Sequence, residues 1–205
     1  MIEIAENFTD EDWSELEKEL KNDFGNEILW GRALDVFESR LNERYIRPAE
    51  EIQNNLSVKG EGFSITAILC SLIESLETFY VGKCYKYEKP RTNHEYGNGN
   101  SKSLFVNFLS TKEPFNSTFN EDLAEDFFKN VRCALLHEAM TRNGWTIRID
   151  SDVLVEQKGN GKVLNRFYFL ESLKTYIKSY RAEVLGSKDR KNAFIRKMKC
   201  ICQNA

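Results

Sequence analysis

Apolar residues recur at helical spacing along most of this chain, and two segments show the pattern most clearly. Over residues 64–85 they cover most of a helix circumference, which predicts a buried central helix. Over residues 120–145 they mark one side of a helix, formed by Leu123, Phe127, Phe128, Val131, Leu135 and Met140. Asn120 is a good N-cap, and Asn143-Gly144 is typical of a helix end. The pattern predicts two long helices in one core.

Further helices are predicted on both sides of these two. Thr9 to Asp12 resembles a capping box and starts a short acidic helix. A second helix covers residues 29–41, and Pro48 either kinks it or starts a new turn. Ser101 caps another short helix after a polar loop over residues 87–100. Helical spacing returns over residues 167–185 and in a final basic stretch from Asp189 to Cys202.

Beyond Gly144 the hydrophobic period changes from helical to alternating. Trp145, Ile147 and Ile149 alternate with polar residues, and Gly159-Asn160-Gly161 is typical of a turn. This segment predicts a small antiparallel hairpin or meander. The fold class is therefore all-α, a helical bundle with a small β-hairpin insertion.

Length and composition favour one domain of an ordinary globular protein. The chain has 205 residues, of which 41% are hydrophobic and 30% charged. We expect a core of about residues 27–185, an acidic N-terminal helix over residues 1–26 and a basic C-terminal helix over residues 187–205. The acidic start does not resemble a signal peptide, and we expect no membrane-spanning segment, so the sequence favours a cytoplasmic protein.

Cysteine and histidine usage argues against metal chemistry. Five cysteines without a CxxC pair favour reduced thiols, and two histidines without an HExxH motif give little basis for a zinc site. We therefore predict no metal and no cofactor.

Charge is distributed unevenly along the chain. The N-terminal segment is acidic, whereas the last helix is rich in basic residues. A segregated basic segment can bind the phosphates of RNA, or it can pack on the fold and meet the acidic N-terminus. The predicted nucleic-acid-binding residues are Arg190, Lys191, Arg196, Lys197 and Lys199.

The helix over residues 120–145 also contains the chain's most informative pair of polar residues. Arg132 and His137 form an R-x4-H pattern, and a polar loop separates the central helix from the later helices. This arrangement, over about residues 63–140, resembles the HEPN superfamily of all-α domains. The resemblance implies a HEPN-like fold, a homodimer with a composite site, and in many members a metal-independent endoribonuclease of defence or toxin-antitoxin systems. The residue after the arginine, commonly Asn, Asp or His in ribonuclease members, is Cys133 here.

The pair suits RNA cleavage without metal. A histidine can take the 2′-OH proton, and an arginine fork can stabilise the charge on the phosphorane, leaving a 2′,3′-cyclic phosphate. Five residues place the two Cα positions about 140° apart around a straight helix. The long arginine side chain, a local bulge or a partner subunit must therefore bring the two groups together.

Each of these residues also has a structural interpretation. Arg132 can form an ion pair with Glu125 or Glu74, and His137 can be a buried structural histidine. Four residues are accessory candidates for the site, namely Cys133, Glu74, Glu138 and His94. Glu138 is more simply explained by an i,i+4 pair with Arg142, and His94 by an exposed loop position.

Three functions therefore remain open. The leading one is a metal-independent endoribonuclease, or a nuclease-derived component of a defence or toxin-antitoxin system with an antitoxin partner. The second is a non-catalytic HEPN-like module that binds a nucleotide, RNA or a protein. The third is a helical protein in which Arg132 forms only a buried ion pair.

Overall fold

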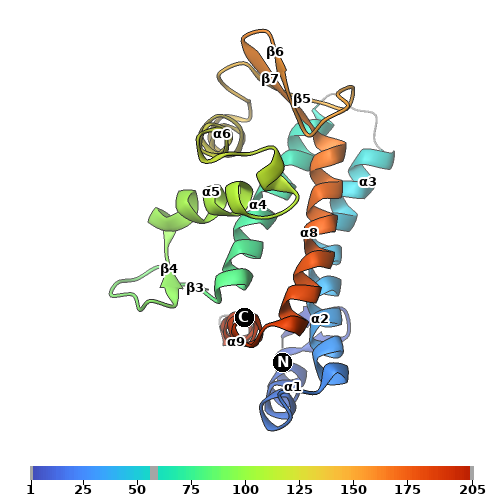
Figure 1. The fold of residues 1–205 in the computed structure, drawn as a ribbon, viewed down its shortest axis with the longest axis vertical. Helices are drawn as coiled ribbons and strands as arrows, with labels where there is room; N and C mark the ends of the chain where they lie inside the picture. The colour runs from blue at the N-terminus through green and yellow to red at the C-terminus, as the bar shows by residue number, and fades with distance from the viewer. Residues whose placement is uncertain (1, 56–59, 204–205) are drawn as a thin grey trace. The chain divides into compact units, whose positions relative to one another are not determined.

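The chain is mostly helical, with small sheets of two or three strands, throughout residues 2–55 and 60–203, which the computed structural model describes (Figure 1). Contacts divide it into two units, each built from segments that are far apart in the sequence. The first comprises the described parts of Met1–Arg44, Thr78–Asn100 and Ile177–Ala205, and the second those of Tyr45–Glu77 and Ser101–Tyr176.

The first unit contains the two ends of the chain. Its elements are β1 (Glu3–Ala5), β2 (Phe8–Thr9), α1 (Asp10–Asn22), α2 (Glu27–Leu41), the end of α4 (Glu61–Val81), β3 (Cys84–Tyr85), β4 (Glu95–Tyr96), the 3-10 turn η2 (Asn98–Asn100), the second part of α8 (Arg166–Gly186) and α9 (Lys188–Gln203). The predicted capping box is confirmed, because the Asp12 amide donates to the Thr9 hydroxyl and the Thr9 amide to the Asp12 carboxylate.

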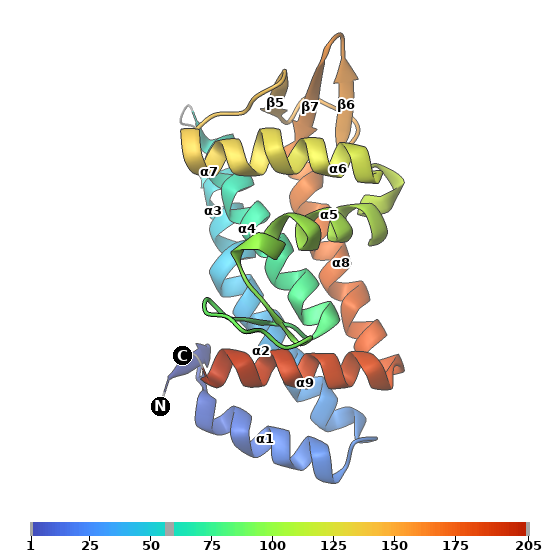
Figure 2. The ribbon, with the colours of Figure 1, turned by 90° about the vertical axis from the view of Figure 1, so that its left-hand side faces the viewer.

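Aromatic rings from several segments form the core of the first unit. The Phe194 ring of α9 lies 5.6 to 6.2 Å, centroid to centroid, from the rings of Trp13, Trp30, Phe37 and Phe79. All five side chains are almost completely buried. Helix α9 is therefore part of this core, and Figure 2 shows it between α1 and the end of α4.

A disulfide joins Cys84 of β3 to Cys200 of α9, with 5.7 Å between their Cα atoms. The expectation of five reduced thiols is therefore wrong for these two residues. They are 116 positions apart in the sequence, so no spacing rule could pair them.

The second unit contains the remaining elements. They are the π-helical turn η1 (Asn42–Ile46), which crosses its boundary, α3 (Arg47–Asn55), the first part of α4 (Glu61–Val81), α5 (Ser101–Thr111), the 3-10 turn η3 (Phe115–Ser117), α6 (Glu121–Phe127), the π-helical turn η4 (Phe128–Cys133), α7 (Ala134–Glu138), β5 (Trp145–Arg148), β6 (Val155–Lys158), β7 (Gly161–Asn165) and the first part of α8. Helix α2, the turn η1 and α3 follow one another without a gap, and Pro48 is the second residue of α3, directly after the irregular turn.

Phe127 of α6 is at the centre of the second core. Its ring lies 5.2 to 6.0 Å from those of Phe105, Phe119, Trp145 and Phe169. These rings come from α5, the segment before α6, β5 and α8. The core therefore fixes α6 against the sheet and against α8.

The predicted hairpin is confirmed, whereas the predicted meander is wrong. Strands β6 and β7 pair antiparallel around Gly159, but β5 pairs with β7 in parallel, so the order is β5-β7-β6. The connection from β5 to β6 crosses over instead of turning back. The Asn165 amide donates to the backbone oxygens of Ile149 and Ser151 and so holds this crossover.

Two predicted helix ends are also wrong. Helix α4 ends at Val81 because Gly82 has φ +66°, and a Cβ there would lie 2.7 Å from the Ala193 Cα atom. The helix with Arg132 ends at Glu138, because Ala139 is left-handed with φ 52°. Met140 therefore lies beyond the helix and is 48% exposed, although its spacing predicted a buried position.

Helix α4 is the predicted central helix. By length and composition it could cross a membrane, contrary to our expectation from the sequence, but 56% of its apolar stretch is buried inside the protein. It also carries the carboxylates of Glu74 and Glu77. Both features favour a core helix.

Candidate functional site around Arg132

Arg132 and His137 lie on the continuous helical stretch formed by α6, η4 and α7. Asn120 caps it as predicted, because its side-chain oxygen accepts from the Leu123 amide. Arg132 is in the π-helical turn, and His137 is next to the last residue of α7. A π-turn inserts one residue into the helix and rotates the following residues relative to a straight helix.

Arg132 forms one of the two ion pairs predicted for it. Its Nη2 atom lies 3.6 Å from Oε2 of Glu74, and its guanidinium lies 5.3 Å from the centre of the Phe128 ring. Glu74 also accepts a hydrogen bond of 3.0 Å from the Ser101 hydroxyl. The alternative partner, Glu125, pairs with Lys102. Helices α4 and α5 thus hold the arginine, whose side chain is 20% exposed.

His137 is exposed, in contrast to the expectation of a histidine next to the core. Among the described residues it forms no hydrogen bond or ion pair, with Arg132 or with any other group. Its neighbours Leu136 and Met140 are 55% and 48% exposed. The end of α7 and the residues directly after it therefore expose a histidine together with two apolar side chains.

The two remaining accessory residues of this helix have simple surroundings. Cys133 is a free, half-buried thiol directly after Arg132. The Arg142 Nε atom donates to Glu138 at 2.7 Å, and the two side chains form the predicted i,i+4 ion pair. Glu138 is therefore engaged by Arg142 and is not directed at Arg132.

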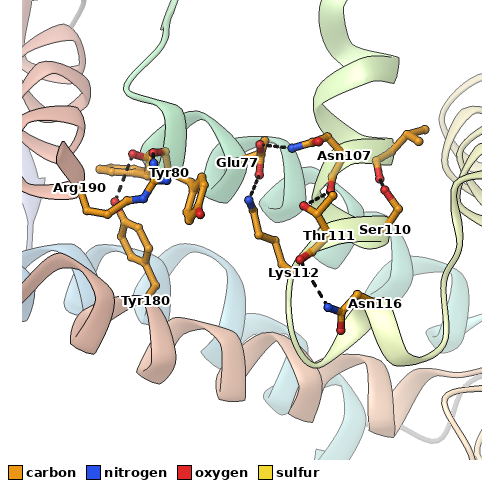
Figure 3. Close-up of polar contacts among 11 residues, drawn as sticks. Glu77, Tyr80, Asn107, Ser110, Thr111, Lys112, Asn116, Tyr180 and Arg190 are labelled. Carbon is orange, nitrogen blue, oxygen red and sulfur yellow. Dashed lines mark hydrogen bonds and ion pairs between the residues drawn. The ribbon is translucent and has the colours of Figure 1, made fainter. Parts of the chain in front are cut away.

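The carboxylates of Glu74 and Glu77 in the apolar part of α4 are both paired, as the sequence suggested for acids in an apolar helix. Figure 3 shows Glu77 between Asn107 and Lys112. The Asn107 amide donates to Glu77 at 2.6 Å, and the Lys112 ammonium lies 3.8 Å from its other oxygen. Glu77 is 1% exposed, so this pair is a buried feature of the core.

His94 belongs to the other unit, in the segment between β3 and β4. Its side chain is exposed, and its backbone oxygen accepts from the Cys84 amide at 2.8 Å. This backbone pairing explains its position without any role for the imidazole.

Two of the five lysines and arginines predicted to bind nucleic acid are buried. Lys191 is 9% exposed, and its ammonium lies 5.1 Å from the centre of the Trp30 ring. Lys197 is 8% exposed and lies 5.7 Å from the centre of the Tyr96 ring. Contact of these two residues with RNA stays a prediction, which their burial disfavours because aromatic rings cover their aliphatic stems and charges.

The other three residues predicted to bind nucleic acid are more accessible. The Arg190 guanidinium stacks 3.5 Å from the centre of the Tyr80 ring, and its Nη1 atom donates to the backbone oxygen of Tyr80. Figure 3 shows the two residues. Arg196 donates to the Gly82 oxygen at 3.5 Å, and Lys199 is exposed. Helix α9 thus uses most of its basic residues for packing.

A polar hub at Asp126 was not found by sequence reasoning. Its carboxylate accepts from Asn130 at 2.7 Å, Asn143 at 3.1 Å and the Trp145 indole at 2.7 Å, and lies 3.2 Å from the Lys162 ammonium. Burial opposes ionisation, but these donors outweigh it and lower the pKa of Asp126 below its ordinary value. The only sequence signal is an acid one position before two phenylalanines on a core-facing helix.

No group of three or more His, Cys, Asp or Glu side chains that could hold a metal ion occurs in the part of the chain that the structure describes. Comparisons with models of protein families, with curated proteins and with solved structures found no match to this chain.

Proposed function

We propose that this protein is a HEPN-like, metal-independent endoribonuclease that acts as a homodimer. The proposal assigns proton transfer from the 2′-OH to His137 and stabilisation of the phosphorane to Arg132. It rests on the R-x4-H pattern within a mostly helical fold and on one observation above all, the exposure of His137. A general base must reach its substrate, and this imidazole is accessible.

The same observation disfavours a purely structural role for the histidine. A structural histidine is typically buried and hydrogen-bonded, whereas His137 has no such partner among the described residues. Arg132 differs, because its pair with Glu74 is the one that a structural role predicts. For the proposed reaction, Glu74 orients the guanidinium and leaves its other nitrogens for a phosphate.

A second copy of the chain is part of the proposal. No hydrogen bond or ion pair joins Arg132 to His137 among the described residues of one chain. A two-fold axis near the end of α7 would bring the histidine of one copy to the arginine of the other. Leu136 and Met140 beside His137 supply exposed apolar surface for such a contact.

Cleavage of a mixed RNA pool in EDTA tests the reaction. His137→Ala and Arg132→Ala should each reduce cleavage by about 100-fold or more while the protein stays folded, and the products should carry 2′,3′-cyclic phosphates. His94→Ala, which removes the other histidine of the chain, is the matched control and should cleave like the wild type. Loss of activity in EDTA that Mg²⁺ restores would contradict the proposal.

Light scattering tests the assembly. The wild type should be a dimer at micromolar concentration, and Leu136→Glu should give an inactive monomer because it places charge in the apolar contact. Ile28→Glu is the control, since Ile28 is 77% exposed and belongs to the other unit. A wild-type monomer with full activity would refute the composite site.

Two observations favour a second candidate, a non-catalytic module that binds RNA or a protein. Cys133 occupies the position after the arginine, and Glu74 offsets the charge of Arg132. The same RNA pool distinguishes the candidates. Binding that Arg132→Ala weakens, together with a wild type that never cleaves, would favour the module.

A further inference from the structure

A cleft of about 430 Å³ lies in the second unit, between the start of α4, β5 and the start of α8. Figure 1 shows where these three elements are found. Neither Arg132, His137 nor any of their accessory candidates lines this cleft. Its walls are formed by Gly60 to Phe63, by Ile147 to Asp150 and by Arg166. This volume suits a small molecule.

A buried ion pair with unused hydrogen-bonding capacity lies in the wall of the cleft. Arg166 is 6% exposed, and its Nη2 atom donates to Oε1 of Glu61 at 2.5 Å. The Nη1 atom of Arg166 and Oε2 of Glu61 are also buried, and neither has a partner among the described residues. Buried polar groups are normally satisfied. These two atoms have almost no accessible surface, so they meet a ligand when the two side chains turn toward the cleft, a rotamer change that is common on binding.

Two further groups favour an anion at this position. Arg148 of β5 lines the cleft, is exposed, and forms no ion pair within the described residues. The first turn of α4 also lines it, and the first amides of a long helix attract negative charge. Gly62 lets the start of α4 pack closely on β5, because a Cβ there would lie 3.1 Å from the Ile147 side chain.

We propose that this cleft binds the phosphate group of a small phosphate monoester in its singly protonated form. Such a phosphate offers oxygens that accept from Arg166, Arg148 and the start of α4, together with one P–OH that donates to the free oxygen of Glu61. The organic part of the ester covers Phe63 and Ile149, which are 39% and 60% exposed.

The carboxylate of Glu61 makes the site selective. A phosphate monoester loses its second proton near pH 6, so the singly protonated form is abundant in mildly acidic solution. Sulfate has the same shape and oxygen atoms but no proton to donate to Glu61. The cleft should therefore prefer phosphate to sulfate, whereas a simple basic patch would not.

Calorimetric titration of the full chain at a pH of about 6 tests the site with three probes. Inorganic phosphate should bind with a dissociation constant of roughly 1 mM, and sulfate about 10-fold more weakly. Phenyl phosphate should bind more tightly than inorganic phosphate, because its ring packs on Phe63. Equal affinity for phosphate and sulfate, or no binding of any probe, would overturn the proposal.

Two variants identify the groups involved. Arg148→Ala should weaken phosphate and sulfate alike by about 10-fold, and Arg32→Ala, an exposed arginine of the other unit, should weaken neither. Glu61→Gln should weaken phosphate but not sulfate and so abolish the preference. If Glu61→Gln does not fold, the Arg148 variant and the sulfate comparison still decide. Unchanged phosphate binding in Arg148→Ala would place the anion elsewhere.

Discussion

Asp126 illustrates how much one residue connects in this protein. Its carboxylate receives donors from its own helical stretch, from the loop after α7 and from β5, and it lies beside Lys162 of β7. Hydrogen bonds to a charged group are stronger than neutral ones. This residue therefore couples the helix that carries Arg132 to the sheet.

Asp126→Ala should lower the free energy of unfolding at neutral pH by about 2 to 4 kcal/mol, because it leaves buried donors unpaired. The pKa of Asp126 is lowered in the folded state, so its stabilisation is present above the ordinary value of 3.8 and is lost as the pH falls through the folded value. In urea unfolding, the difference in free energy of unfolding between the wild type and Asp126→Ala should be smaller at acid pH than at neutral pH. Asp152→Ala, which removes an exposed loop acid, should unfold with the same free energy as the wild type at either pH.

Ala139 is the residue that ends the helix with Arg132 and His137. A left-handed backbone disfavours alanine, whereas glycine adopts it freely. We expect Ala139→Gly to raise the free energy of unfolding by about 0.5 to 1 kcal/mol. Ala182→Gly, an exposed position within α8, should lower it by about 1 kcal/mol. Destabilisation by both substitutions in chemical denaturation would show that Ala139 is not left-handed in solution.

At the scale of the element, α9 combines a basic sequence with a buried packing face. Its sequence is basic, but it places Phe194 in an aromatic core and covers two of its lysines with rings. The positive charge of a helix is thus no measure of its accessible charge. This outcome favours the interpretation of α9 as a packing element.

Phe194→Ala should therefore destabilise the protein by about 3 to 5 kcal/mol, because the cavity lies among four aromatic rings. Lys199→Ala should change stability by less than about 0.5 kcal/mol, since Lys199 is exposed. Thermal denaturation of both variants checks this. A nearly unchanged melting temperature for Phe194→Ala would mean that α9 is not docked in solution.

At the scale of the whole molecule, the chain combines two units whose segments alternate along the sequence. The disulfide lies within the first unit, but the loop that it closes contains the longer of the two segments of the second unit, Ser101–Tyr176. Closing a loop of 116 residues removes much of the conformational freedom of the unfolded chain.

Reduction should consequently lower the free energy of unfolding by about 2 to 5 kcal/mol. Denaturation with and without dithiothreitol measures this difference. Cys84→Ser is the internal control, because its stability should match that of the reduced wild type and should not respond to the reductant. A wild type that is insensitive to reductant would contradict the pairing of Cys84 with Cys200.

Local signals in the sequence were sufficient for most helices. Caps at Thr9 and Asn120 and apolar spacing act within one or two turns, so the helix starts and the hairpin turn at Gly159 could be predicted. For the candidate site, the sequence identified Arg132 and His137 and named Glu74 as a partner, because charge in an apolar helix needs a counter-charge.

Only the tertiary structure decided which residues meet across long separations. Four features depend on segments that are distant in the sequence. They are the disulfide, the burial of Lys191 and Lys197, the parallel pairing of β5 with β7, and the unpartnered atoms of the ion pair between Arg166 and Glu61. The early end at Ala139 also belongs here, because the following segment returns to pair the Arg142 amide with the Asn130 oxygen. Periodicity shows which side of a helix is apolar, but packing determines what covers each side chain.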